Sequence, residues 1–142
     1  MDVSLFVRRL QGAVEGVMEI GGAADLAAAM RGHARPPAIY VMPAAERARE
    51  VDMTNPCGSG GGRVQVVNVI TVVDELSDPT GAGALRGLPA LRQQIDARLN
   101  GWQLSETLTD PVQFVEGELV QFEGDGLLWW GDTYTYVRYG EF

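Results

Sequence analysis

The stretch Arg63–Val73 constrains the fold more than any other part of this sequence. Its residues, RVQVVNVITVV, are mostly β-branched, include neither Gly nor Pro and carry a single charge, which predicts a long β-strand. Its first half alternates polar and apolar side chains, so one face meets solvent. Its second half is apolar on both faces, so both faces need a cover. We expect a helix of this chain on one face and a second copy of the protein on the other.

Hydrophobic spacing predicts that the rest of residues 1–142 completes a single α+β domain. The expected elements are helices at about 2–11, at 23–30 and at 88–99, with Pro89 in the first turn of the last, and strands at 38–42, 112–115, 118–123 and 127–139. Pro43 is expected to end the first of these strands. Asn100-Gly101 is expected to stop the last helix, and a Gly-containing turn at 124–126 joins the final hairpin. The order predicts a mostly antiparallel sheet packed by helices on one face.

Residues 44–62 are predicted to form a long flexible loop. The first part, 44–50, has room for a helical turn, whereas Asn55–Gly62 is too rich in Pro and Gly for regular structure. The connection is far longer than a usual hairpin loop. Loops of that length in compact domains are usually functional or disordered.

The net charge of −8 and the sequence pI of about 4.5 argue against a nucleic-acid-binding protein, because such binding needs clustered basic side chains. All basic side chains apart from His33 are Arg. A G+C-rich coding sequence accounts for that most simply. The alternative is that some Arg make planar, bidentate contacts that Lys does not make.

Cysteine usage and hydropathy place the protein among soluble proteins made in the cytosol. Cys57 is the only cysteine, so no intrachain disulfide is possible. The segment Met1–Arg9 does not resemble a signal peptide. No apolar run approaches the roughly 20 residues that span a bilayer, so we expect no membrane partner.

No residue pattern indicates an enzyme, a metal site or a cofactor site. The glycine-rich segment 58–62 is followed by a strand, whereas a Walker loop ends in Gly-Lys-Ser/Thr and leads into a helix. The segment Gly81–Gly87 has the wrong spacing for a dinucleotide fingerprint and is interpreted as a turn. His33, the only histidine, is expected in a loop, and Cys57 lies well away from it in sequence.

Acidic and aromatic side chains in the last third of the chain allow two readings each. The acids could supply a carboxylate pair, with Glu116 and Glu118 on one strand face, but solvated edge charges are the simpler interpretation. The aromatic residues could form a ligand platform, although most should be core. Trp129 and Trp130 are adjacent on a strand and must face opposite ways, so one of them lies under a second layer or at an interface. The acids are Glu116, Glu118, Glu123, Asp125 and Asp132, and the aromatic residues are Trp102, Trp129, Trp130, Tyr134, Tyr136 and Tyr139.

Four blocks of sequence resemble, in their order, the tail terminator proteins of long-tailed bacteriophages and prophages. The blocks are GGAADLAA at 21–28, PAIYVMPA at 37–44, the Val-rich strand with the helix that ends in LNGW at 99–102, and GLLWW at 126–130 running into YVRY at 136–139. They span most of the chain. The AADLAA block and the helix ending in Gly-Trp are the most specific. The chain departs from the family at Gln103-Leu104, where a Pro is expected, and in its 58–62 loop.

The resemblance implies a structural protein with a small α/β fold. Copies of such proteins form a ring, typically of six, on the end of a completed tail tube, where the ring stops tube polymerisation and offers a surface for the head. The implied partners are other copies of the chain, the tail tube protein and a head–tail connector protein. The implied location is the virion, and the host cytoplasm during assembly. DNA passes through the centre without being read, and acidic side chains facing the channel would keep it from sticking.

The loop at 44–62 is expected to reach the neighbouring subunit or the tube, because it is long and adjoins the central strand. The residues expected at this interface are Arg47, Arg49, Arg63, Gln65, Val67, Val69 and Trp129. Two other functions remain open. One is another neck, head–tail connector or minor tail protein, and the other is a small-ligand-binding α+β domain that uses the aromatic strand.

Overall fold

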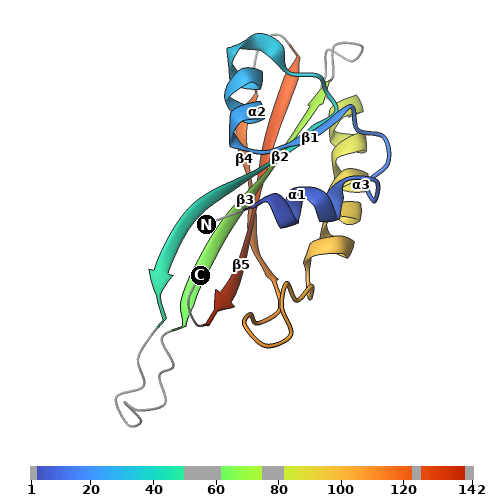
Figure 1. Ribbon diagram of the computed structural model, residues 1–142. Helices are drawn as coiled ribbons and strands as arrows, with labels where there is room; N and C mark the ends of the chain where they lie inside the picture. The colour runs from blue at the N-terminus through green and yellow to red at the C-terminus, as the bar shows by residue number, and fades with distance from the viewer. Residues whose placement is uncertain (1–2, 50–61, 75–81, 123–125, 140–142) are drawn as a thin grey trace.

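The predicted α+β class is confirmed by the computed structural model, which describes residues 3–49, 62–74, 82–122 and 126–139. A five-stranded sheet has the strand order β1-β2-β3-β5-β4. The elements in chain order are α1 (Ser4–Leu10), β1 (Glu19–Gly21), α2 (Ala23–Ala28), the short π-helix η1 (Ala29–His33), β2 (Ala38–Ala48), β3 (Arg63–Asp74), α3 (Ala82–Leu99), β4 (Gln113–Phe122) and β5 (Leu127–Arg138) (Figure 1).

The predicted central strand is β3, which lies in the middle of the sheet. It pairs antiparallel with β2 on one side and with β5 along its whole length on the other, from Arg63 opposite Arg138 to Asp74 opposite Leu127. β4 pairs antiparallel with β5, and only the short β1 runs parallel to its neighbour β2. The sheet is therefore mostly antiparallel, as expected from the sequence.

One face of the sheet, called here the α3 face, carries the larger core. Val67, Val69 and Val73 of β3 are buried there against Phe6 and Leu10 of α1. The predicted apolar stripe of α3 is buried against the same cluster. That stripe consists of Leu88, Leu91, Ile95 and Leu99. Burying a side chain of this size stabilises the fold by roughly 1.5–3 kcal/mol, so these residues hold α3 on the sheet.

The opposite face, called here the α2 face, is covered at one end by α2 and η1. Leu26 and Ala29 pack there on Tyr40, Ile70 and Trp129. In Figure 1, α2 lies to the left of the upper ends of the strands and α3 to their right. The expectation that all helices lie on one face is therefore wrong in this detail, because the Ala-rich helix, whose small side chains allow close packing, covers the second face itself.

β2 extends further than the sequence predicted. Pro43 does not end the strand, which continues to Ala48 with an irregularity in its register between Pro43 and Ala45. The long β3 offers a pairing partner as far as Arg63, and a Pro is tolerated on an edge strand or at a bulge. Residues 44–48 are therefore strand, neither loop nor helical turn. Residues 50–61 of the predicted loop, with Cys57, lie outside the described residues.

Two other elements also differ from the sequence-based expectation, whereas the end of α3 agrees with it. α3 begins at Ala82 and contains Pro89, whereas Pro89 was expected in its first turn. The two short strands expected at 112–115 and 118–123 are one strand, β4, with register shifts between Phe114 and Glu116 and between Leu119 and Gln121. Gly101 has a φ of 85°, which only glycine adopts readily, and it ends α3 as predicted. No described helix has the length and apolarity needed to cross a membrane.

Candidate assembly surfaces

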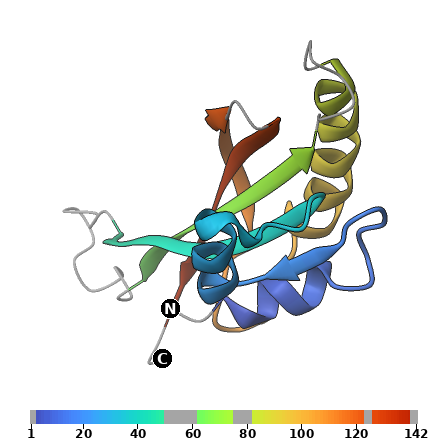
Figure 2. The ribbon, with the colours of Figure 1, turned by 90° about the horizontal axis from the view of Figure 1, so that it is seen from above.

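The hairpin of β2 and β3 forms an arm at one end of the sheet. The arm is defined here as Pro43–Ala48 of β2 with Arg63–Val66 of β3, and it projects away from the helices (Figure 2). Only Ala38–Tyr40 of β2 pair with β1, so the outer edge of β2 along the arm has no neighbouring strand among the described residues. The arm is therefore a candidate contact surface.

The three predicted arginines lie on this arm (Arg47 and Arg63) or directly after it (Arg49), and their surroundings differ. Arg63 donates to Glu46 at 2.9 Å, and this hydrogen bond lowers the pKa of the Glu46 carboxyl. Arg49 donates to the Tyr139 hydroxyl at 2.8 Å and stacks over its ring. Arg47 is exposed and takes part in no ion pair with another described residue. Arg47 is thus the best placed of the three to meet a partner.

The other four predicted interface residues are buried within the chain itself. Gln65, Val67 and Val69 lie on the α3 face with at most 2% of their surface exposed. Trp129 is 5% exposed on the α2 face and packs against Leu26 of α2. An interface role for these four stays untested, and their burial in the chain's own core leaves them no surface to offer a partner. Trp129 and Trp130 do face opposite sides of the sheet, as predicted.

β4 is the other edge of the sheet and carries most of the exposed apolar surface in the described sheet. Its exposed apolar side chains are Phe114 (39%), Val115 (52%), Leu119 (53%) and Val120 (52%). Glu116 and Glu118 pair with Thr133 and Gly131 of β5, so both point to the α2 face, as predicted for a shared strand face. Both glutamates are exposed and neither forms an ion pair with a described residue. The edge thus combines apolar contact area with negative charge.

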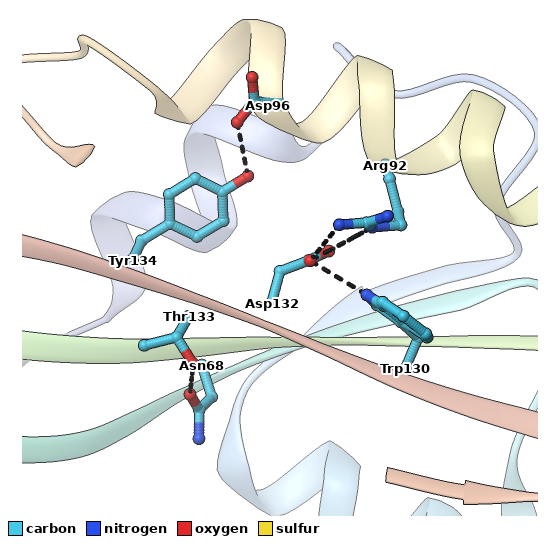
Figure 3. A network of polar contacts seen from close by, with 7 residues as sticks. All are labelled: Asn68, Arg92, Asp96, Trp130, Asp132, Thr133 and Tyr134. Atoms are coloured by element: carbon cyan, nitrogen blue, oxygen red, sulfur yellow. Dashed lines mark hydrogen bonds and ion pairs between the residues drawn. The ribbon is translucent and has the colours of Figure 1, made fainter. Parts of the chain in front are cut away.

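A polar network connects α3 to β5 behind this edge (Figure 3). Asp132, only 2% exposed, accepts hydrogen bonds from the Arg92 guanidinium at 2.9–3.2 Å and from the Trp130 indole N–H at 3.0 Å. The hydrogen bond to Asp132 raises the pKa of Arg92. Nearby, the Tyr134 hydroxyl donates to Asp96 at 3.1 Å, and burial is the main cause that raises the pKa of Tyr134.

Gly117 of β4 lies directly against this network, on the side of the sheet edge. A Cβ built on it would overlap Asp132 Oδ1 and would meet the Arg92 guanidinium at 2.8 Å, so only a glycine fits without rearrangement. An open hollow of about 340 Å³ lies beside the network, between α3 and the edge of the sheet. The Asp132 carboxylate is already bound by two donors, Arg92 and Trp130, and the network connects α3 to β5.

This network was not predicted from the sequence. Asp132 was grouped with solvated edge acids, which is wrong, because β5 is an inner strand and the carboxylate is buried. The available signal was an acid between two aromatic residues, Trp130 and Tyr134, on one strand face. A carboxylate in that setting needs a cation, and Arg92 lies off the apolar stripe of α3.

The described residues show no candidate metal site. They contain no group of three or more His, Cys, Asp or Glu side chains placed to hold a metal ion. His33 is exposed near the end of η1. The arm and the β4 edge, which are open or exposed among the described residues, form the candidate assembly surfaces.

Comparisons with known proteins agree with an assembly role. A family model described as "Phage tail terminator protein" matches residues 1–139. Among solved structures, a chain described as "Virion of native gene transfer agent (GTA) particle" has a TM-score of 0.52 and 14% sequence identity, and the match covers 96% of this chain and 86% of that chain. At that identity the likeness concerns the fold. No curated protein matches the sequence.

Proposed function

The chain belongs to the phage tail terminator family, a family of structural phage proteins, and we propose that its copies form a closed ring that caps the tail tube. The ring stops tube polymerisation and provides the surface to which the head is joined. Its partners are other copies of the chain, the tail tube protein and a head–tail connector protein, and the number of copies is proposed to be six. Assembly takes place in the host cytoplasm.

The match of residues 1–139 to the family is the observation that carries this proposal. The shape of the molecule supports it independently. A ring subunit needs two different surfaces that fit one another, because head-to-tail contacts close a ring. The described sheet has two such surfaces at opposite edges, the arm and the β4 edge.

The acidity of the chain supports the proposed passage of DNA. Each copy carries a formal net charge of −8, and a ring multiplies this charge by the number of its copies. Negative charge around a channel repels phosphate and prevents DNA from binding to the wall. We propose that DNA passes through the ring without specific contacts. A ring whose channel is lined by basic side chains would contradict this part of the proposal.

The proposal is tested by polymerising tail tube protein with increasing amounts of this protein and measuring tube lengths by electron microscopy. The expected result is that amounts far below one copy per tube subunit stop tube growth, because only tube ends are occupied. Unchanged tube lengths at every ratio would refute the capping function. Binding to connector complexes without any effect on tube length would instead favour a neck or connector protein.

A further inference from the structure

The sheet has two open edges of complementary character. The outer edge of β4 is open along Gln113–Phe122, and the outer edge of β2 is open along the arm, from Met42 to Ala48, as far as the described residues show. Open edges present unpaired backbone N–H and C=O groups, and proteins protect them or use them for pairing.

The β4 edge combines bulky apolar residues with negative charge that has no ion-pair partner among the described residues. Val115, Leu119 and Val120 are each more than half exposed, and Glu116 and Glu118 lie among them. An exposed strand of this kind attracts partners. Its two bulges and two glutamates discourage indiscriminate pairing, so only a strand that matches both features will bind well.

The side chains along the arm edge are small and include a positive charge, whereas those along the β4 edge are bulky and include negative charges. Its residues Pro43, Ala44 and Ala48 are exposed and small. Arg47 is exposed and without an ion-pair partner among the described residues, whereas Glu46 is already paired with Arg63. The arm therefore offers a positive charge and room for bulky side chains, which are the two features that the β4 edge requires.

Given the proposed ring, we propose that the β4 edge of one copy pairs with the outer edge of the β2 arm of the next copy, with Glu116 opposite Arg47. The pairs β2–β3, β3–β5 and β5–β4 are all antiparallel, so β4 runs opposite to β2. Copies that face the same way around a ring are thus joined by an antiparallel pair, which continues the sheet from copy to copy.

One register satisfies the charges and the side-chain sizes together. With Glu116 opposite Arg47, the bulky β4 residues meet small arm residues. The resulting pairs are Val115 with Ala48, Leu119 with Ala44, and Val120 with Pro43. Arg47 pairs with Val64 of β3, and Glu116 is connected through Thr133 to Asn68 of β3, so both side chains point to the α2 face.

The same register gives a strand tilt that a closed sheet can accept. Within one copy, Glu116 pairs with Thr133, Thr133 pairs with Asn68, and Asn68 pairs with Met42. Glu116 and Met42 therefore lie at the same position along the strand direction. Pairing with Arg47 of the next copy therefore shifts each copy by about five residues, or roughly 17 Å at about 3.3 Å per residue. The strands β2, β3, β5 and β4 span roughly 19 Å at about 4.8 Å each. The resulting slope of about 40° lies within the range of closed barrels, about 35–45°.

Cysteine cross-linking tests the joint directly. In a Cys57→Ser background, the variant with Ala45→Cys and Glu118→Cys places the two thiols opposite one another in this register, on the α2 face of both copies. Oxidation is expected to give a ladder of covalent oligomers on a denaturing gel, with and without tail tubes present. The matched control combines Ala45→Cys with Met30→Cys, because Met30 is 69% exposed and lies outside the proposed joint. The control is expected to stay monomeric.

A charge exchange tests the same contact without cysteines. Arg47→Glu and Glu116→Arg should each raise the concentration at which half of the protein is assembled by about tenfold or more, because like charges then face one another. The double variant should restore assembly. Arg8→Glu changes the net charge by the same amount as Arg47→Glu, at an exposed position on α1. It serves as the control for net charge and should leave assembly unchanged.

The outcomes separate this joint from the ring itself. If rings are seen by native mass spectrometry but the Ala45/Glu118 variant gives no ladder, the joint is wrong and the ring proposal stands. If no rings form alone or on tubes, both proposals are wrong. If Glu116→Arg abolishes tube capping while ring mass is unchanged, the β4 edge meets the tube protein and the proposed partner is overturned.

Discussion

Replacing Arg92 with Ala should destabilise the protein more than replacing Asp132 with Ala, although the two residues form one ion pair. The reason is the unequal burial of the partners, because the Asp132 side chain is 2% exposed and the Arg92 side chain is 34% exposed. Without Arg92, a buried carboxylate loses its cation and keeps only the Trp130 N–H. Without Asp132, the guanidinium can turn toward water.

The expected magnitudes follow from this asymmetry. Removing one partner of a buried pair and leaving the other charge buried costs about 3–5 kcal/mol, and we expect Arg92→Ala to lie near the lower end, because the adjacent hollow is open. Asp132→Ala loses hydrogen bonds but leaves a charge that water can reach, so we expect about 1–2 kcal/mol. The exposed control Arg8→Ala should change stability by less than about 0.5 kcal/mol.

Urea unfolding followed by circular dichroism measures these differences. With a denaturant dependence of about 2 kcal/mol per molar urea, Arg92→Ala should lower the unfolding midpoint by about 1.5 M and Asp132→Ala by about 0.5–1 M. Equal losses, or a larger loss for Asp132→Ala, would refute the reasoning that the buried carboxylate is the costly partner. The result also bears on assembly, because Gly117 of the β4 edge lies directly against Asp132 and Arg92.

Three further predictions follow from particular contacts. Gly117→Ala should destabilise the fold by about 1–3 kcal/mol, because its Cβ would overlap Asp132. The control Gly87→Ala has open space around its Cβ and should be neutral or slightly stabilising. Equal urea midpoints for the two variants would contradict the close approach of Gly117 to Asp132. Burial raises the pKa of Tyr40 and Tyr134 in the folded state, so their contribution to stability is complete below pH about 10, the ordinary tyrosine pKa, and is lost as the pH rises above it. The urea midpoint should therefore fall between pH about 8 and about 11, and Tyr134→Phe should make this fall less steep. A midpoint that does not change over this pH range would contradict the prediction. The hydrogen bond from Arg63 lowers the pKa of Glu46. An NMR titration should therefore give Glu46 a higher pKa in the Arg63→Gln variant than in the unchanged protein. Equal pKa values would mean that the ion pair is absent in solution.

The elements with strong periodic patterns were predictable from the sequence. The β3 strand and the apolar stripe of α3 follow from side-chain spacing alone, because each buries a regular face. Gly101 ended α3 where the sequence placed the stop, since a positive φ there favours glycine. These signals are local, and local signals were sufficient for the fold class.

The features that depend on tertiary pairing were not predictable in the same way. β2 continues past Pro43 because β3 provides a partner, and no local property of residues 44–48 indicates a strand. The position of α2 on the second face depends on the side of the sheet along which the chain runs between the parallel strands β1 and β2. Asp132 is buried because Arg92, forty positions earlier, lies opposite it. In each case a distant residue decides the outcome.

The candidate surface was predictable in part. The sequence pointed to Arg47 and the neighbourhood of the central strand, and the structure places Arg47 at an open edge. The sequence indicated solvated edge charges at Glu116 and Glu118, but it did not predict β4 as a contact surface, because the apolar residues there alternate with Glu and Gly and resemble a half-buried strand. Their exposure became evident only from the strand order, which makes β4 an edge.

Imaging tube ends by electron microscopy tests the central claim most directly. Tail tubes assembled in the presence of this protein should carry one closed ring of its copies at a single end, with none along the tube walls. Class averages of the capped ends would also count the copies, which are proposed to be six. Bare tube ends in the presence of excess protein, or protein bound along the sides of the tubes, would contradict the account.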